Sequence, residues 1–354
     1  MSEEKKPKLL DCTLRDGSYA VDFQFTAEFT KTLCSELDLL GFDYIEIGHG
    51  VGIGADKYYR PAIATDFQYA EAASSSVSAA MWGMFAQPHI SKLADIRSLY
   101  EAGMRFIRIG VDFKNLSRGY ELAKQCHDLG LIVFINLMKS YKATKEDFEK
   151  VIDSLNQTDF VSGLYLVDSA GGMLTGQIDS LSKLMDEKLS KRIIMGFHGH
   201  DNLGLALSHS LLVMKNGFSL IDCTLQGLGR SAGNTSTERL IALMNREGLH
   251  TSVDAIAAMK LGESRIRPIL PIAGHSGLDT MAGFTLFHTS YMDELLEIAL
   301  QHRIDPYRLM LEVGSNDLNE IDLDSIIIKL IEQNYKLDFP LPLNRYPGHE
   351  QDLL

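Results

Sequence analysis

Cysteine is scarce in this sequence of 354 residues, and its four copies, Cys12, Cys34, Cys126 and Cys223, are far apart with no CxxC pair. This spacing argues against a disulfide framework or a zinc knuckle and predicts reduced, mostly buried thiols. Long apolar runs are also absent, since no stretch of about 18 apolar residues occurs, and the leading MSEEKKPK lacks the apolar core of a signal peptide. The sequence therefore predicts no membrane span and a cytoplasmic location.

An excess of basic charge is missing as well. Lys and Arg total 34 against 47 Asp and Glu, so the formal net charge is −13. No basic stripe interleaved with aromatic residues offsets this charge, which argues against a nucleic-acid-binding surface. The dinucleotide fingerprint GxGxxG does not follow the first predicted strand, and its absence argues against a doubly wound open sheet.

What the sequence does contain is a regular alternation of short apolar or β-branched runs with segments of helical periodicity. In residues 26–41, for example, Thr26 can cap a helix, apolar residues recur every three or four positions, and Gly41 can end it. Such alternation predicts parallel strands joined by helices. Eight units of this kind predict an α/β fold, a (β/α)8 TIM barrel with its active site at the C-terminal ends of the strands. The strands are expected near residues 8–13, 43–48, 79–86, 104–111, 130–137, 162–168, 192–198 and 219–224.

Proline marks the end of the predicted barrel. RPILPIAG, with Pro268 and Pro271, should break any helix, and two or three helical stretches follow it up to about residue 335. The last segment, LDFPLPLNRYPGHEQDLL, is rich in proline and should be extended. The predicted domains are a catalytic barrel at 1–265, a small C-terminal helical domain at 266–340 and an extended tail at 341–354.

Polar residues stand where the predicted strands end. LLDCTLRDG runs into Arg15 and Asp16, and IIMGFHGHDN contains His198 and His200. Because side chains two apart on a strand point the same way, the two imidazoles form a candidate ligand pair. Asp16 could complete a His-His-carboxylate site that suits Mn, Mg, Co, Fe or Zn, and Arg15 offers a fixed cation for a developing oxyanion. An isolated HxH is more often a pair of core histidines, and the second polar strand end is what favours a metal site.

Further polar residues follow the other strands. After the eighth strand comes GLGRSAGNTSTE, whose glycines allow the backbone to approach a ligand and whose Asn234 could be a further metal ligand or could orient one. A plain glycine-rich turn explains this segment equally well. Strands two to six are followed by His49, Gln87, Asp112, Asn136, Asp168 and Ser169.

The motifs RDG, IEIGHG, VDSAG, GFHGHDNLGLA and GLGRSAGN, in this order, resemble those of the DRE-TIM metallolyases. Within that superfamily the chain is most similar to the 4-hydroxy-2-oxovalerate aldolases, and the resemblance covers nearly all of it. It implies a class II pyruvate aldolase, a carbon-carbon lyase that cleaves or forms a 4-hydroxy-2-oxo acid from pyruvate and an aldehyde. It also implies a divalent metal, Mn²⁺ first, with Mg²⁺, Co²⁺ or Zn²⁺ as alternatives, held by Asp16, His198 and His200 with Asn234 beside them.

The resemblance also assigns substrate contacts. Arg15 would share the charge of the enolate, and the hydroxyl or backbone of Ser169 would hold the substrate carboxylate. His49 is expected to bind substrate or to serve, with Glu46, in a proton relay. Glu46 could equally be a structural partner of Arg15.

The chain departs from the aldolases at the predicted base. They carry a histidine two residues after the glycine of RDG, where this chain has Tyr19. A free tyrosine has a pKa of about 10, so it would need help from the metal or from Arg15 to act as a base at neutral pH. The segment GFTLFHTSY aligns best with a family helix that brings a tyrosine over the site, and it places His288 there. Tyr291 is three residues on, and a slightly different alignment would favour it instead. The sequence thus predicts that Tyr19 and His288 have exchanged roles and that the acceptor is larger or more polar than acetaldehyde.

Partners are also implied. IDPYRLMLEVG, at 304–314, and the helix after it look like the family's communication domain, which docks an acylating aldehyde dehydrogenase. The apolar helix DLDSIIIKLIEQ is expected either to dock a partner or a second copy in a homodimer, or to pack on its own barrel.

Three other functions remain open. A Claisen-type synthase of the isopropylmalate synthase kind, condensing an acyl-CoA with a 2-oxo acid, shares the metal site, but RDGSY lacks the RDGEQ pattern of that group. A Schiff-base aldolase needs a buried lysine at a strand end, and the only candidate, Lys139, fits an exposed loop residue better. A non-catalytic binding barrel would explain Tyr19, but it has no need for the polar cluster of Arg15, Asp16, His198, His200 and Asn234.

Overall fold

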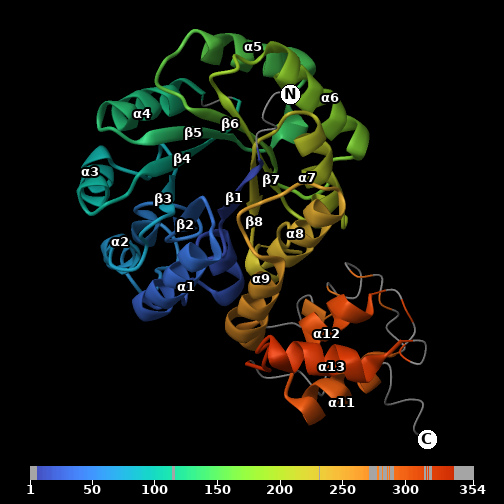
Figure 1. Ribbon diagram of the computed structural model, residues 1–354. Coiled ribbons are helices and arrows are strands. Elements are labelled where there is room, and N and C mark those ends of the chain that lie inside the picture. The colour runs from blue at the N-terminus through green and yellow to red at the C-terminus, as the bar shows by residue number, and fades with distance from the viewer. Residues whose placement is uncertain are drawn as a thin grey trace, which may run out of the picture.

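The computed structural model describes residues 6–113, 116–230, 232–270, 277–278, 281, 285, 287, 291–314, 316, 318 and 321–338. Eight parallel strands pair in chain order and close into a barrel through the pairing of β1 with β8. Figure 1 shows the strands at the centre with the helices around them. The strands are β1 Lys8–Asp11, β2 Tyr44–Ile47, β3 Met81–Ala86, β4 Phe106–Val111, β5 Ile132–Leu137, β6 Gly163–Asp168, β7 Ile194–Gly199 and β8 Leu220–Cys223. The predicted TIM barrel is confirmed, and each strand lies within its expected range to within a residue or two.

Local sequence signals explain where helices begin and end. The Thr26 hydroxyl accepts a hydrogen bond from the Phe29 N–H (3.0 Å), and Gly41 ends the first helix at a φ of 91°. The helices that cover the barrel are α1 Ala27–Leu40, α2 Asp66–Ser74, α3 Leu93–Glu101, α4 Leu116–Asp128, α5 Lys145–Asn156, α6 Thr175–Lys188, α7 Ala206–Lys215, α8 Thr237–Arg246 and α9 Ala255–Leu261.

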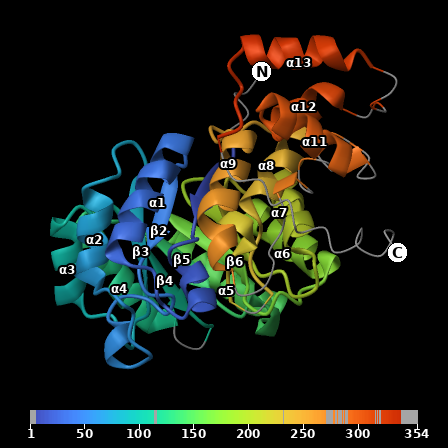
Figure 2. The same cartoon turned by 90° about the horizontal axis from the view of Figure 1, so that it is seen from below.

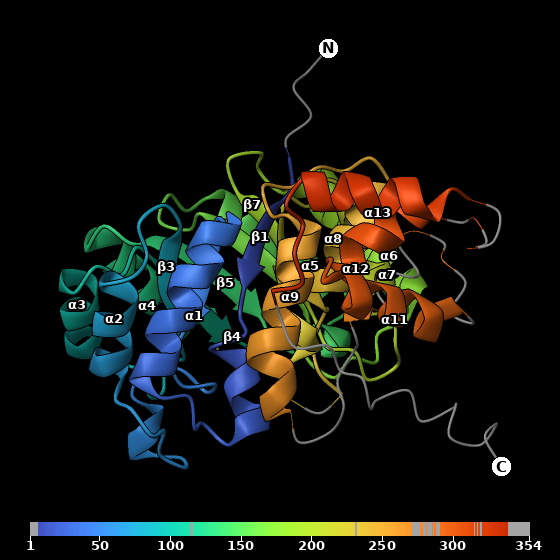
Figure 3. The same cartoon turned by 60° about the horizontal axis from the view of Figure 1, so that its bottom comes forward.

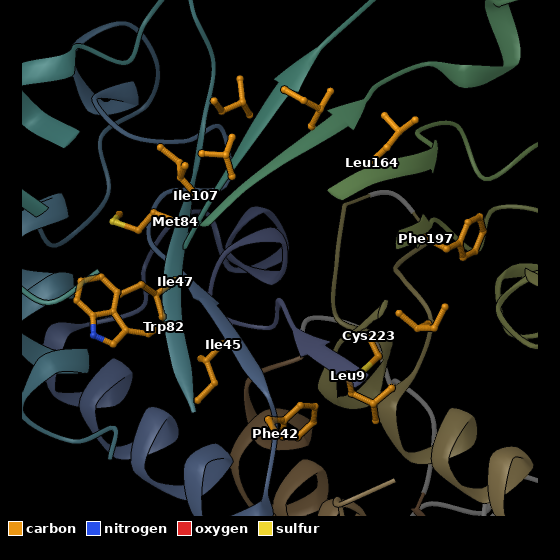
Figure 4. Close-up of a cluster of buried hydrophobic side chains, with 14 of the residues drawn as sticks. Leu9, Phe42, Ile45, Ile47, Trp82, Met84, Ile107, Leu164, Phe197 and Cys223 are labelled. Carbon is orange, nitrogen blue, oxygen red and sulfur yellow. The ribbon is translucent and has the colours of Figure 1, made fainter. Parts of the chain in front are cut away.

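The main core lies between the barrel and its helices. Alternate strand residues, such as Leu9, Ile45, Ile107 and Phe197, point outward and are fully buried against helical side chains. Figure 4 shows part of this cluster. The alternation leaves every second strand residue pointing into the barrel, so the same strands also build its interior.

Inside the barrel an aromatic layer supports a polar one. Tyr44 and Phe106 meet edge to face with ring centroids 5.3 Å apart, and Phe134 meets Tyr165 in the same way at 6.0 Å. Gly196, on β7, leaves room for the Tyr165 ring, since a Cβ there would lie 2.7 Å from it. Two residues further along β2, β4 and β8 the inward positions carry charges, and these are Glu46, Arg108 and Asp222.

In the described part of the chain the predicted C-terminal helical region contains α11 Met292–His302, α12 Pro306–Val313 and α13 Leu323–Glu332. Figures 1, 2 and 3 all show them together beside α8 and α9. Their own apolar cluster also contains Ala242, Ile256 and Met259 from α8 and α9, so the packing does not divide sharply at residue 265. The predicted tail at 341–354 lies outside the described residues. Within those residues no helix has the length and hydrophobicity that spanning a bilayer requires.

Candidate active site

Three candidate metal ligands meet at the C-terminal ends of β1 and β7. One ligand atom from each of Asp16, His198 and His200 lies within 4.8 Å of the others. Asp16 is the first residue of the short 3-10 helix η1 (Asp16–Val21), directly after β1, while His198 lies in β7 and His200 just past its end. All three side chains are buried, so the closed barrel brings together the groups that the sequence places about half the chain apart.

Both imidazoles are oriented by groups that can only accept a hydrogen bond. Nδ1 of His198 lies 2.7 Å from Oδ2 of Asp222, and Nδ1 of His200 lies 3.3 Å from the carbonyl oxygen of Gly233. Each Nδ1 therefore carries the hydrogen, which leaves the Nε2 lone pairs available to a metal. Burial lowers the pKa of His200 to about 4, so this ring is neutral at physiological pH. Two imidazoles whose Nε2 atoms are available and a carboxylate are a donor set that fits a divalent ion.

Asn234 adds a second sign of cation binding. Its Nδ2 donates to Oδ2 of Asp16 (2.6 Å) and to the carbonyl of Leu228 (3.3 Å). Its Oδ1 is buried and has no hydrogen-bond partner among the described residues. A buried oxygen normally has a partner, and an unpaired one beside three candidate ligands is what a site for a bound cation would show.

A buried chain of charges connects the ligands. Arg15 donates from Nε to Glu46 (2.6 Å) and from Nη1 to Asp16 (2.7 Å). Arg108, which is fully buried, pairs with Glu46 and with Asp222, the carboxylate that holds His198. Asp16 and His198 are thus tied to one network of alternating charges, which offsets the cost of burying them.

The network also sets the protonation of the site. Burial alone would raise the pKa of Asp16, but the Arg15 guanidinium, aided by the hydrogen bond from Asn234, holds that pKa well below its usual range. For Arg15, burial opposes the charged form, yet the carboxylates of Glu46 and Asp16 outweigh it and raise its pKa. Asp16 is therefore an anionic candidate ligand, and Arg15 is a permanent cation beside it.

A cavity of about 480 Å³ opens over this cluster. Its inner wall contains the candidate ligands and Arg15, whose Nη2 is used by neither of its ion pairs. The rest of the wall combines aromatic, amide and basic side chains. The lining residues are Arg15, Asp16, Tyr19, Phe23, Gly50, Val51, Tyr59, Arg60, Phe85, Gln87, Asn136, Met138, Lys139, Val167, Ser169, His198, His200 and Arg230.

The other predicted residues divide into those that reach the cavity and those that do not. Tyr19 and Ser169 line it. His49 does not: its ring is buried, with Nδ1 accepting from the Val51 N–H (3.1 Å) and Nε2 donating to the carbonyl of Arg60 (2.8 Å). Both nitrogens are used to hold a loop, so the expected contact of His49 with substrate does not fit this geometry. His288 lies outside the described residues.

Tyr19 is poorly suited to act as a phenolate. Burial raises the pKa of its hydroxyl above the ordinary value, although Arg15 and Arg230 act in the opposite direction. The guanidinium of Arg230 lies over the Tyr19 ring, 5.5 Å from its centroid, and Phe23 packs on the ring edge at 5.3 Å. Tyr19 is therefore a neutral hydroxyl in a fixed place on the cavity wall.

The sequence interpretation missed Arg108 and Asp222, which hold the ligands without touching the cavity. A signal for them exists, because each lies two residues after an inward apolar side chain, Phe106 and Leu220, in a strand that is otherwise apolar on that face. A charge at such a position needs a partner inside the barrel. Glu46, which was open between a relay and a structural partner of Arg15, forms that ion pair at 2.6 Å.

Comparison with known proteins places this geometry among related chains. A family model described as HMGL-like matches residues 6–264. A protein of Nocardia farcinica named 4-hydroxy-2-oxovalerate aldolase 2 is 32% identical over 310 residues, covering 86% of this chain and 88% of its own. A protein of Rhodococcus opacus with the same name is 34% identical over 268 residues, covering 75% of this chain and 76% of its own.

Solved structures share the fold at lower identity. The N-terminal domain of a putative aldolase from Bacteroides vulgatus is 22% identical with a TM-score of 0.60, covering 92% of this chain and 99% of its own. The hydroxymethylglutaryl-CoA lyase of Pseudomonas aeruginosa is 20% identical with a TM-score of 0.66, covering 79% of this chain and 98% of its own.

Proposed function

We propose, from the premise that this chain belongs to the HMGL-like family, that it is a pyruvate aldolase, a carbon-carbon lyase that cleaves or forms a 4-hydroxy-2-oxo acid. The observation that carries the proposal is the donor set of Asp16, His198 and His200, with both Nδ1 atoms engaged and both Nε2 atoms available, beside the Arg15 guanidinium. Relatives that match most of the chain are named 4-hydroxy-2-oxovalerate aldolase, which is the activity this donor set would support.

Asp16, His198 and His200 would hold a divalent ion, with Asn234 as a further ligand or as the group that orients Asp16. A bound ion would act as a Lewis acid on the keto group of a 2-oxo acid. Of the ions that suit two imidazoles and a carboxylate, Mn²⁺ is the one we propose, with Mg²⁺, Co²⁺ and Zn²⁺ as alternatives.

Arg15 would stabilise the charge that develops when the C3–C4 bond breaks. The electron pair of that bond moves onto C3 and the C2 oxygen of pyruvate, so an enolate forms. The guanidinium lies on the cavity wall, is held by Glu46 and Asp16, and has Nη2 available to donate to that oxygen. Ser169, at the end of β6, would bind the substrate carboxylate.

Tyr19 would hold the oxygen on C4. That hydroxyl must lose its proton as the aldehyde forms, and a tyrosine with a raised pKa serves better as a hydrogen-bonding relay than as the final base. In the described residues the only histidines on the cavity wall are the two ligands, and His288 stays the predicted partner in this proton transfer. His49 would act indirectly, by holding the loop that carries Tyr59 and Arg60 over the cavity.

The test is pyruvate release from a panel of 4-hydroxy-2-oxo acids, coupled to lactate dehydrogenase, with Mn²⁺, Mg²⁺, Co²⁺ or EDTA. Release that requires metal and stops with EDTA is the expected result, and the preferred chain length would indicate the aldehyde. No release from any member of the panel would overturn the proposal. Free thiol production from an acyl-CoA and a 2-oxo acid would then favour the Claisen-type synthase.

Association and location remain proposals. Ile328 and Ile331 are exposed on α13, and Leu311 is exposed on α12. We propose that this apolar surface joins two copies of the chain. An acylating aldehyde dehydrogenase partner and a cytoplasmic location rest on the resemblance and on the composition.

A further inference from the structure

The active-site cavity adjoins a second one. This neighbour, of about 240 Å³, shares Gln87, Met138 and Lys139 with the first cavity and continues toward Arg118 at the start of α4. Pro88, His89, Gly110, Val111 and Asp112 complete its lining. Acetaldehyde has only two carbons, so a substrate built from it would leave this outer space unused.

The first cavity carries an excess of positive charge beyond the candidate metal ligands. Arg60, Lys139 and Arg230 line the first cavity beyond the metal ligands. Arg60 pairs with Asp22, whereas neither Lys139 nor Arg230 has a carboxylate within ion-pair distance among the described residues. Asp16 is the one carboxylate on the described wall of the first cavity, where Arg15 matches it, and Asp112 lines the second cavity. In a chain with a net charge of −13 this concentration of cations needs an explanation.

The backbone of Lys139 and the guanidinium of Arg230 are held in place. Lys139 is a non-glycine residue with a φ of 56° and a ψ of 41°, a left-handed conformation that persists only where the surroundings impose it. Its N–H donates to the Ser169 hydroxyl (2.9 Å), and Nη2 of Arg230 donates to the Ser169 carbonyl (3.4 Å). Ser169 therefore contacts both the backbone of Lys139 and the side chain of Arg230. The Arg230 guanidinium also packs over the Tyr19 ring.

Asn136 supplies an independent observation. It lies on β5, lines the first cavity, and is 2% exposed, and its Oδ1 has no hydrogen-bond partner among the described residues. A buried amide oxygen without a partner costs stability unless a ligand satisfies it. Asn136 lines the same cavity as Lys139 and Arg230, so a single extended substrate can contact all three.

We propose that the acceptor aldehyde carries an anionic terminal group, a carboxylate or a phosphate, which Lys139 and Arg230 bind, while Asn136 binds a polar group on the intervening chain. This inference rests on the proposed aldolase function. In the condensation, C3 of pyruvate loses a proton and bonds the aldehyde carbon, and the aldehyde oxygen takes up a proton, so no further reactant is needed.

The experiment is the condensation of pyruvate with acetaldehyde, butanal, succinic semialdehyde and glyceraldehyde 3-phosphate in the presence of Mn²⁺. We expect kcat/KM for at least one anionic aldehyde to exceed that for butanal by tenfold or more. A higher value for succinic semialdehyde would identify the terminal group as a carboxylate, and a higher value for glyceraldehyde 3-phosphate would identify it as a phosphate. Lys139→Met and Arg230→Met should each reduce this anionic-to-neutral ratio severalfold. Lys142→Met, an exposed lysine three residues away that lines neither cavity, is the matched control and should leave the ratio unchanged.

Equal kcat/KM values for butanal and the anionic aldehydes, or a ratio that Lys139→Met and Arg230→Met do not lower, would overturn the inference. Exchange of the pyruvate methyl hydrogens in D₂O separates this failure from that of the proposed function, because exchange requires only enolisation. Metal-dependent exchange without a preference for anionic aldehydes would reject the inference alone. Absence of both exchange and condensation would reject the aldolase function, and the inference with it.

Discussion

At the scale of single residues, the site depends on groups that never meet the substrate. Asp222 accepts from His198 and from Arg108, so one carboxylate sets the orientation of a ligand and neutralises a buried cation. Burial would raise the pKa of Asp222, but Arg108 and His198 lower it. The anionic form of Asp222 therefore supports the proposed metal site by holding His198, although Asp222 does not line the cavity.

Asp222→Asn should weaken metal binding by roughly 10- to 100-fold, because the amide cannot match the charge of Arg108 and holds the His198 tautomer less firmly. Titration calorimetry with Mn²⁺ on the folded protein would measure the change. Asp179→Asn, an acidic residue on α6 that is bonded to Lys183, is a suitable control. An unchanged metal affinity in Asp222→Asn would contradict the network described above.

His200→Ala should abolish metal-dependent turnover with little loss of fold, since it removes one of the two proposed nitrogen ligands. Metal content by elemental analysis and circular dichroism would be measured together. His127→Ala, at an exposed position on α4, controls for the loss of an imidazole. Full activity of His200→Ala at normal metal content would show that the ligands are assigned wrongly.

Glu238, in α8, should make stability depend on pH. Burial raises the pKa of Glu238 to about 7, although it accepts from Gln226 and Ser236. Its pKa in the unfolded chain is about 4.3, so the folded form binds the proton more tightly, and stability should fall as pH rises from about 4 through 7. Between pH 5 and pH 8 the free energy of unfolding should fall by about 1 to 3 kcal/mol less in Glu238→Gln than in the wild type, as measured by urea denaturation. If the free energy of unfolding depends on pH in the same way in wild type and variant, the raised pKa of Glu238 is contradicted.

At the scale of elements, the turn between β6 and α6 supports the end of β7. Asp168 accepts from the N–H groups of Gly172 (3.2 Å) and Met173 (3.0 Å), and its carbonyl accepts from the His200 N–H (3.3 Å). Gly171 sits within this turn at a φ of 59°, and a Cβ there would lie 2.8 Å from the carbonyl oxygen of His200. The proposed metal ligand His200 and the turn are thus in direct backbone contact.

Gly171→Ala should therefore displace the end of β7, reducing stability by about 1 to 3 kcal/mol and Mn²⁺ affinity by an order of magnitude or more. Gly172→Ala is the matched control, because its φ is ordinary and the nearest atom to its Cβ is 3.9 Å away. Thermal unfolding and metal titration of both variants would test the pair. Equal behaviour of the two alanine variants would mean that the turn does not position His200.

At the scale of the whole molecule, the C-terminal helices are attached to the barrel, and in the part of the chain that the structure describes Leu311, Ile328 and Ile331 are exposed on them. Lys260, at the end of α9, pairs with Asp305 (2.7 Å) before α12 and with Asp338 (3.1 Å) after α13. Lys329 on α13 binds Glu312 on α12 (2.6 Å), which fixes the two helices to each other. The exposed isoleucines of α13 therefore belong to an ordered surface that a second copy could cover.

Size-exclusion chromatography with light scattering should give a dimer, and Ile331→Asp should convert it to a monomer by placing a charge in the contact. Leu39→Asp provides the control, since Leu39 on α1 is 83% exposed and far from α13 in sequence. A wild-type protein that is monomeric at micromolar concentration would exclude obligate self-association.

By itself the sequence determined the barrel, the order of its strands and the candidate triad of Asp16, His198 and His200, because period-two alternation and polar strand ends are local signals. Only the tertiary structure decided how inward residues meet. It joined Arg15, Glu46, Arg108 and Asp222 into one network and turned His49 away from the cavity. The reason is that the closure of the sheet sets which inward side chains face each other across the barrel. These residues are far apart in the sequence, and no local pattern indicates that they meet.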